Sequence, residues 1–209
     1  MDEVTVLAPA SVSNVVCGFD CLGFALAEPF DKLTVRRIAE RTVRIRHLDD
    51  FGLPTEPEAN VAGVALLALM QNSELDFGFE VDIEKGLMPG SGIGSSAASS
   101  CGAVVAANHL LDERFSKKEL AEFAMAGERL ASGARHADNV APCIFGGFTL
   151  VRSIEPLDIV PLEFTTLYAT VIHPQIQIVT ADARAILPER VPLRDAVRQW
   201  ANLGAFVAA

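Results

Sequence analysis

The residues whose types and spacing point most clearly to a chemical function form a glycine-rich stretch between positions 88 and 98. It consists of Met88, Pro89, Gly90, Ser91, Gly92, Ile93, Gly94, Ser95, Ser96, Ala97 and Ala98. Glycines at alternate positions allow backbone conformations that are closed to residues with a Cβ, so successive N–H groups can converge on an anion. The stretch therefore predicts a cradle for phosphate groups and favours a nucleotide-using enzyme.

A strand and a helix are expected to position this cradle. Phe77, Phe79, Val81 and Ile83 alternate with polar residues, which indicates a strand, and residues 96–111 are rich in Ala, Val and Leu, which indicates a helix. The first turn of a helix carries unsatisfied N–H groups and a partial positive charge. A bound phosphate is therefore stabilised there.

Two familiar phosphate-binding motifs do not fit the stretch. A Walker-type loop needs a Gly-Lys-Ser/Thr ending, which is absent, and the dinucleotide fingerprint needs a glycine where Ser95 stands. A plain glycine-rich turn between a strand and a helix stays open as the alternative, because a lone glycine motif is weak evidence.

The remaining sequence alternates between strand and helix patterns. The patterns predict strands over residues 4–8, 33–37, 42–46 and 163–172, and helices over 61–71, 181–187 and from 192 to the end. Pro9 is expected to end the first strand. Ser116 and Glu119 form a capping box that predicts a helix to about residue 131. Residues 144–151 indicate a tight bend into a strand.

The composition excludes several classes of protein. A net charge of −10 over 209 residues and a pI near 4.8 argue against binding to nucleic acids or anionic membranes. The apolar runs are too short to span a bilayer, and the acidic start has no features of a signal peptide, so we expect a cytoplasmic protein. The four cysteines form no metal-ligand pattern and are expected to be buried free thiols.

Two further segments strengthen the interpretation of the glycine stretch. Residues 8–23 read APASVSNVVCGFDCLG, and residues 135–142 read RHADNVAP before Gly146 and Gly147. Together with the glycine stretch they resemble the GHMP kinase superfamily, and within it the homoserine kinases. Residues 181–188 also look like those enzymes, and the resemblance covers essentially the whole chain.

The resemblance implies an α+β fold of two layers. Residues 1–150 would form an ATP-binding domain like domain 2 of ribosomal protein S5, and residues 151–209 part of a ferredoxin-like domain. The family's third, glycine-rich motif is not found before Ala209, and the last helical pattern lacks a stop signal, so we expect the chain to be a piece of a longer protein. Val16 stands where the family usually has a glycine, so the backbone of that loop is expected to differ.

The resemblance also implies an ATP and Mg²⁺ site. Backbone N–H groups from Gly90 to Ser96 would hold the phosphates, while Ser96 and Glu128 would hold Mg²⁺, a hard cation that prefers oxygen ligands. Ser95 is the competing hydroxyl ligand, and without the resemblance Glu128 would be interpreted as a solvated carboxylate. The implied contacts to the adenosine are Asn60 and Lys85, the latter otherwise a surface charge at the end of a strand.

A separate group of residues is implied for the second substrate, L-homoserine. The implied contacts are Asn14, Asp20, His136 and Arg184. A carboxylate such as Asp20 can pair with the substrate's ammonium group, and Arg184 can hold its carboxylate through two parallel hydrogen bonds. Asp138 or Asn139 would orient the reacting hydroxyl. His136 could be a base, a substrate donor or a structural turn residue, so no base is assigned.

The implied reaction transfers the γ-phosphoryl group of ATP to the hydroxyl of L-homoserine, a step toward threonine, and the family also implies a homodimer. Two alternatives stay open. One is a GHMP kinase that acts on mevalonate, shikimate or a sugar, and the other is an ATP-binding protein of the same fold without catalysis. Among these acceptors, only homoserine needs a carboxylate partner such as Asp20 for its ammonium group.

Overall fold

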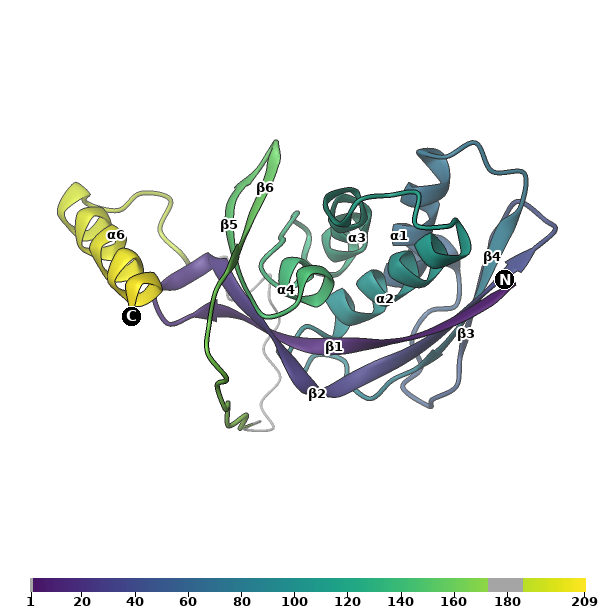
Figure 1. Ribbon diagram of the computed structural model, residues 1–209, viewed down its shortest axis with the longest axis horizontal. Coiled ribbons are helices and arrows are strands. Elements are labelled where there is room, and N and C mark those ends of the chain that lie inside the picture. Colours follow the sequence, from purple (N-terminus) through teal and green to yellow (C-terminus); the bar gives the residue numbers. More distant parts are fainter. Residues whose placement is uncertain (1, 173–185) are drawn as a thin grey trace.

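A six-stranded mixed sheet organises the part of the chain that the computed structural model describes, residues 2–172 and 186–209. The strands are β1 (Glu3–Val15), β2 (Gly18–Ile38), β3 (Val43–His47), β4 (Gly78–Glu84), β5 (Phe148–Ile154) and β6 (Leu157–Leu162). They lie in the order β3-β4-β2-β5-β6, with β1 paired to β2, and only the β3–β4 pair is parallel. The long β1–β2 hairpin runs the length of this sheet (Figure 1).

The first strand is longer than the sequence pattern predicted. We expected Pro9 to end it, but β1 continues to Val15 and its pairing with β2 shifts register between Pro9 and Ser11. A proline has no N–H to donate, so it is tolerated in a strand that pairs on one side or at a bulge, and both conditions hold here. The prediction of a break at Pro9 was therefore wrong.

The helices form a layer on one face of the sheet (Figure 1). They are α1 (Val61–Gln71), α2 (Ser95–Leu110), α3 (Lys117–Ser132) and the short α4 (Val140–Phe145), with a 3-10 turn η1 (Pro57–Ala59). The α6 helix (Leu193–Ala208) lies apart from this layer, near one end of the β1–β2 hairpin (Figure 1). Leu33, Phe79 and Val81 on the sheet are fully buried in the core. The α2 helix packs mainly on β1 and β2, and its small residues let it approach closely. At Gly102, an added Cβ would lie closer to the Leu33 side chain than van der Waals contact allows. The observed architecture is α+β, as predicted.

The helices with clear local signals agree with their predictions. The α1 helix has the bounds expected from its periodicity, and the α3 helix begins with the complete Ser116–Glu119 capping box. The α6 helix also matches its prediction, and its Leu193, Val197 and Trp200 side chains are exposed. Within the described ranges, no helix combines the length and the hydrophobicity needed to cross a membrane.

The predictions were poorer after residue 139. The α4 helix and the β6 strand were not expected, and residues 163–172 form no strand. That segment had a suitable pattern, but no neighbouring strand pairs with it. Most of the helix expected over 181–187 lies outside the described residues. The division near residue 150 falls inside β5, which pairs with β2, and the two-domain organisation stays a prediction.

The cysteines are free thiols, as expected, but they are less buried than predicted. Cys101 is buried in α2, whereas Cys17, Cys21 and Cys143 are partly exposed. Burial raises the pKa of the Cys101 thiol well above its ordinary value, and the neighbouring Cys143 thiol adds to this effect. Cys101 is thereby kept neutral and poorly nucleophilic.

Candidate active site

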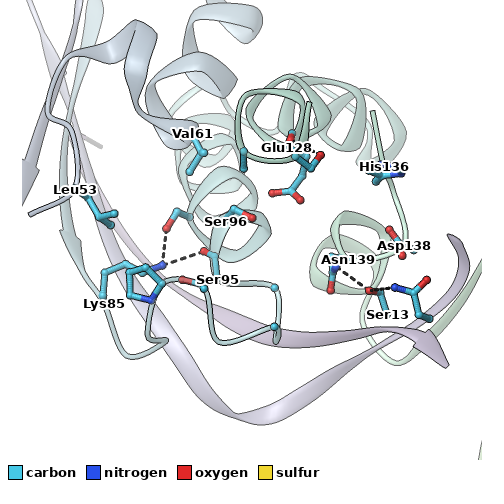
Figure 2. A pocket seen from close by; sticks show the side chains of 18 residues that line it. Ser13, Leu53, Val61, Lys85, Ser95, Ser96, Glu128, His136, Asp138 and Asn139 are labelled. Carbon is cyan, nitrogen blue, oxygen red and sulfur yellow. Dashed lines mark hydrogen bonds between the residues drawn. The ribbon is translucent and has the colours of Figure 1, made fainter. Parts of the chain in front are cut away.

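A hollow of about 570 Å³ lies between the glycine-rich loop, the α3 helix and the turn before α4 (Figure 2). Pro89, Gly90 and Gly92 line it from the loop. Glu128 faces the hollow from α3, and the turn contributes a second group, His136, Asp138 and Asn139. Residues predicted from three distant segments therefore share one pocket.

The glycine loop adopts the special backbone conformations for which glycine is suited. Gly90, Gly92 and Gly94 have φ values of 75°, 80° and 69°, in the left-handed region. Gly94 is also the residue that precedes the first turn of α2, and an added Cβ there would overlap the Ser11 hydroxyl of β1. The loop thus delivers the chain to the helix start, where unpaired N–H groups are available for an anion.

Not every residue of the predicted stretch reaches the pocket. Ser95 and Ser96 line it, but Ala97 and Ala98 are fully buried in the core of the domain. Met88, Ser91 and Ile93 also lie outside the pocket lining. The stretch is therefore part binding surface and part anchor for α2.

Ser96, in the first turn of α2, and Glu128, on α3, both line the pocket. Figure 2 places the Glu128 side chain facing α2, and a hydrogen bond with Ser96 lowers the pKa of its carboxyl. Burial raises that pKa by more, so the net pKa is above its ordinary value. The Glu128 Oε1 atom is buried without a hydrogen-bond partner, and the residue is only 6% exposed. The interpretation of Glu128 as a solvated surface carboxylate was wrong.

An unpartnered buried carboxylate oxygen is costly unless a cation or a donor meets it. The donor set here is one carboxylate and one hydroxyl beside a phosphate cradle, which are oxygen ligands of the type that Mg²⁺ takes together with substrate phosphates. The residues present therefore fit this ion.

The Ser95 hydroxyl is committed elsewhere. It donates a hydrogen bond to the Leu87 carbonyl oxygen at 3.1 Å, and the Ser95 carbonyl oxygen accepts one from Lys85 Nζ at 2.9 Å. Ser95 thus fastens the start of α2 to the entry of the loop. Of the two serines, Ser96 is the one beside Glu128.

The two residues expected beside the adenosine differ in position. Lys85 lines the pocket, but its side chain is 1% exposed and paired with Asp31, so the expectation of a surface charge was wrong. Asn60 caps α1: its Oδ1 accepts bonds from two N–H groups, and its amide group donates to Pro54 O. The structure does not bring Asn60 to the pocket wall. Leu53 and Val61, which the sequence did not single out, form an apolar wall on the Lys85 side of the pocket (Figure 2).

The opposite end of the pocket begins at the tip of the β1–β2 hairpin. Asn14 and Asp20 have φ values of 55° and 58°, which their short polar side chains tolerate better than most residues do. The Asn14 Oδ1 atom accepts a hydrogen bond from the Asp20 N–H at 2.9 Å. Val16 has a φ of 52° in the same turn, and a β-branched residue is strained there.

The turn before α4 is bound tightly to the hairpin. The Asn139 Oδ1 atom accepts a hydrogen bond from Ser11 Oγ at 2.8 Å. The Asn139 Nδ2 atom donates one to Ser13 Oγ at 3.0 Å, which Figure 2 shows. An added Cβ at Gly23 would overlap the Asp138 carbonyl oxygen. The hydrogen bonds of the neighbouring Asn139 and the close approach of Gly23 together fix the position of the Asp138 backbone at the pocket.

Asp138 is the second buried carboxylate of the site. Burial raises the pKa of its carboxyl most, the charge of Asp20 raises it further, and His136 and Ser13 lower it. Asp20 is therefore close enough to Asp138 to affect its ionisation, although Asp20 is not part of the pocket lining. Arg184, the remaining expected substrate contact, lies outside the described residues.

These features define a class of protein, the ATP-using GHMP kinases. The family model described as GHMP kinases N terminal domain matches residues 60–147, which include the glycine loop, Glu128 and Asp138. The solved structure of homoserine kinase from Cytophaga hutchinsonii is 47% identical, with a TM-score of 0.92, and the match covers 100% of this chain and 67% of that one.

Curated sequences agree with the structural comparison. The homoserine kinase of Chloroherpeton thalassium is 43% identical and that of Chlorobium phaeobacteroides strain BS1 is 42% identical. Each match covers 100% of this chain and 69% of the relative. The chain belongs to the homoserine kinase family, and it spans about two thirds of the length of these relatives.

Proposed function

We propose that this protein transfers the γ-phosphoryl group of ATP to the side-chain hydroxyl of L-homoserine, giving O-phospho-L-homoserine and ADP. Membership of the homoserine kinase family supports this reaction. The observation that carries it is the arrangement of one pocket, with a phosphate cradle and Glu128 at one end and Asp138 at the other. Phosphoryl transfer requires such alignment of donor and acceptor.

The nucleotide end would bind the triphosphate mainly through the backbone. N–H groups between Gly90 and Ser96, together with the start of α2, would meet the phosphate oxygens. Ser96 and Glu128 would hold Mg²⁺, which when bound neutralises charge on the phosphates. The unpartnered Oε1 atom of Glu128 supports this assignment, because it provides a buried negative charge with a free ligand position.

The acceptor end would bind homoserine through side chains. Asp20 would pair with the ammonium group, while Asn14 and His136 would contact the substrate beside it. The family resemblance adds Arg184 for the substrate carboxylate. Asp138 would accept a hydrogen bond from the reacting hydroxyl, and its raised pKa brings it closer to the range in which a carboxylate can accept a proton.

Asn139 would support this end of the pocket through its bonds to Ser11 and Ser13, in addition to any contact with the hydroxyl. The family resemblance also supports a homodimer, which analytical ultracentrifugation tests independently of catalysis.

A coupled ADP-release assay on the natural full-length protein tests the reaction. Mg-ATP is offered with L-homoserine, mevalonate, shikimate or galactose in parallel. Selective turnover of homoserine is the expected result. Selective turnover of another acceptor would contradict the substrate assignment, and ATP binding without turnover of any acceptor would contradict catalysis.

A further inference from the structure

A buried ion pair lies directly behind the glycine loop. Asp31, on β2, and Lys85, immediately after β4, pair across neighbouring strands with side chains 0% and 1% exposed. Burial lowers the pKa of Lys85, and the charge of Asp31 counteracts this effect. Because each charge would be costly alone in the interior, the pair must be fully hydrogen-bonded to persist.

Every polar group of the pair is used inside the protein. Lys85 Nζ donates to Asp31 Oδ2, to the Ser95 carbonyl oxygen at 2.9 Å and to Ser99 Oγ at 2.9 Å. The Ser99 hydroxyl in turn donates to Asp31 Oδ2 at 3.2 Å, which closes a triangle of contacts. The three donor positions of the ammonium group are therefore occupied by protein oxygens, although Lys85 borders the pocket.

The same carboxylate also holds the entry of the loop. Asp31 Oδ1 accepts hydrogen bonds from the N–H groups of Gly86 at 3.0 Å and Leu87 at 2.9 Å. Lys85 holds the exit of the loop through the Ser95 carbonyl oxygen. The two ends of the segment that carries Gly90, Gly92 and Gly94 are thus attached to one buried ion pair.

We propose that Asp31 and Lys85 are positioning residues of the ATP site, which hold the two ends of the phosphate loop at the separation that lets its N–H groups converge on the triphosphate. This role rests on the proposed function, because it requires ATP phosphates at the loop. A binding site that is held in shape in advance loses less entropy on binding. Lys85 acts through the loop and not by contacting the adenosine.

The same two strands offer a matched control. Lys32 and Glu84 are the immediate chain neighbours of Asp31 and Lys85, and they pair at 3.5 Å with side chains 52% and 57% exposed. They lie opposite each other in the β2–β4 register. An exposed ion pair of this kind contributes little, so loss of Lys32 changes the charge of the chain without disturbing the loop.

The test measures the affinities of the natural full-length protein for ATP, adenosine and inorganic tripolyphosphate, by calorimetry or by competition with a fluorescent nucleotide. Lys85→Met is compared with Lys32→Met, which is the same chemical change on the solvent side. Ser99→Ala is included because it removes the bridging hydroxyl without leaving a charge unpaired, so it is expected to fold even if Lys85→Met does not. Thermal unfolding of each variant sets a measuring temperature at which it is folded.

The expected result is a parallel loss of affinity for ATP and tripolyphosphate with no change for adenosine. For Ser99→Ala we expect a loss of about 3- to 10-fold, the range of one hydrogen bond, and for Lys85→Met a larger one. The affinities of Lys32→Met for all three ligands should stay within about 2-fold of those of the wild type.

Three outcomes would overturn the positioning role. They are a loss confined to adenosine and ATP, equal losses in Lys85→Met and Lys32→Met, and unchanged affinities in both Lys85→Met and Ser99→Ala. Wild-type protein that binds neither ATP nor tripolyphosphate would instead overturn the proposed function, so the two failures are distinguishable.

Discussion

The two ends of the pocket present different kinds of groups to a ligand. The nucleotide end uses backbone N–H groups, left-handed glycines and a closed network around Asp31 and Lys85. The acceptor end uses side chains, among which Asp138 is buried and has a raised pKa. Glu128, beside Ser96 at the nucleotide end, shares the burial and the raised pKa of Asp138. We infer that the shape of the loop determines phosphate binding, whereas the charge of a few carboxylates determines the chemistry.

The largest expected effect is at the acceptor end. Asp138→Asn should lower kcat/KM for homoserine by about 10²- to 10⁴-fold, the usual contribution of a group that handles a proton. The affinity for ATP should stay close to that of the wild type, because the loop is untouched. Steady-state kinetics together with ATP calorimetry checks both. An equal loss of ATP affinity would contradict the separation of the two ends.

Glu128→Gln should change activity and stability in opposite directions. We expect kcat to fall by about 10²- to 10³-fold, because one preorganised charge at the phosphates is lost. The free energy of unfolding of the ligand-free protein should rise at pH 7, because a buried carboxylate is replaced by a neutral amide. Urea denaturation measures the second effect. A less stable variant would mean that Glu128 is stabilised by partners other than Ser96.

At the nucleotide end, Gly94→Ala should be destabilising by about 2–5 kcal/mol. The left-handed backbone contributes about 1–2 kcal/mol, and overlap of the new Cβ with Ser11 adds about 1–3 kcal/mol. Gly133→Ala is the matched control, because Gly133 has a φ of 80° with no atom near the position of a Cβ. It should cost only the backbone term. Equal losses in chemical denaturation would show that Ser11 does not constrain the loop.

The pH dependence of stability tests the burial of the Glu128 carboxylate. The pKa of Glu128 is raised above its ordinary value near 4.5, so the folded state binds a proton more readily than the unfolded state. Its contribution to stability is therefore fully present below about pH 4.5 and is lost as pH rises through the raised pKa. Denaturation at a series of pH values should show that the difference in free energy of unfolding between wild type and Glu128→Gln widens as pH rises above about 4.5. A difference that is independent of pH would contradict the raised pKa.

The smallest expected effect concerns the strained turn at the hairpin tip. Val16→Gly should raise the free energy of unfolding by about 1 kcal/mol, because glycine adopts the left-handed conformation without a steric penalty. Thermal and urea denaturation measure the change. A decrease in stability would mean that the greater entropy of glycine in the unfolded chain outweighs the relief of strain.

The features that the sequence predicted well depend on neighbouring residues. The capping box at Ser116, the periodicity of residues 61–71 and the glycine loop are all local signals, and each gave the correct element. The prediction that three polar segments belong to one site also agrees with the shared pocket. It depended on the family resemblance, since turn residues such as Asn14 have no distinctive local signal.

The features that the sequence missed depend on distant partners. Pro9 looked like a break because the sequence does not reveal that β1 pairs with β2 alone. Lys85 looked like a surface charge because its partner, Asp31, is 54 residues away along the chain. Residues 163–172 had a strand pattern, but a strand forms only where another strand is available to pair with it.

The most direct test of the account is a crystal structure of the natural full-length protein with Mg²⁺, a non-hydrolysable ATP analogue and L-homoserine. The account predicts that the triphosphate lies on the N–H groups between Gly90 and Ser96, with Mg²⁺ between Ser96 and Glu128. The homoserine hydroxyl should face Asp138, on the other side of the pocket. A triphosphate bound away from the glycine loop, or a homoserine without contact to the acceptor end, would contradict it.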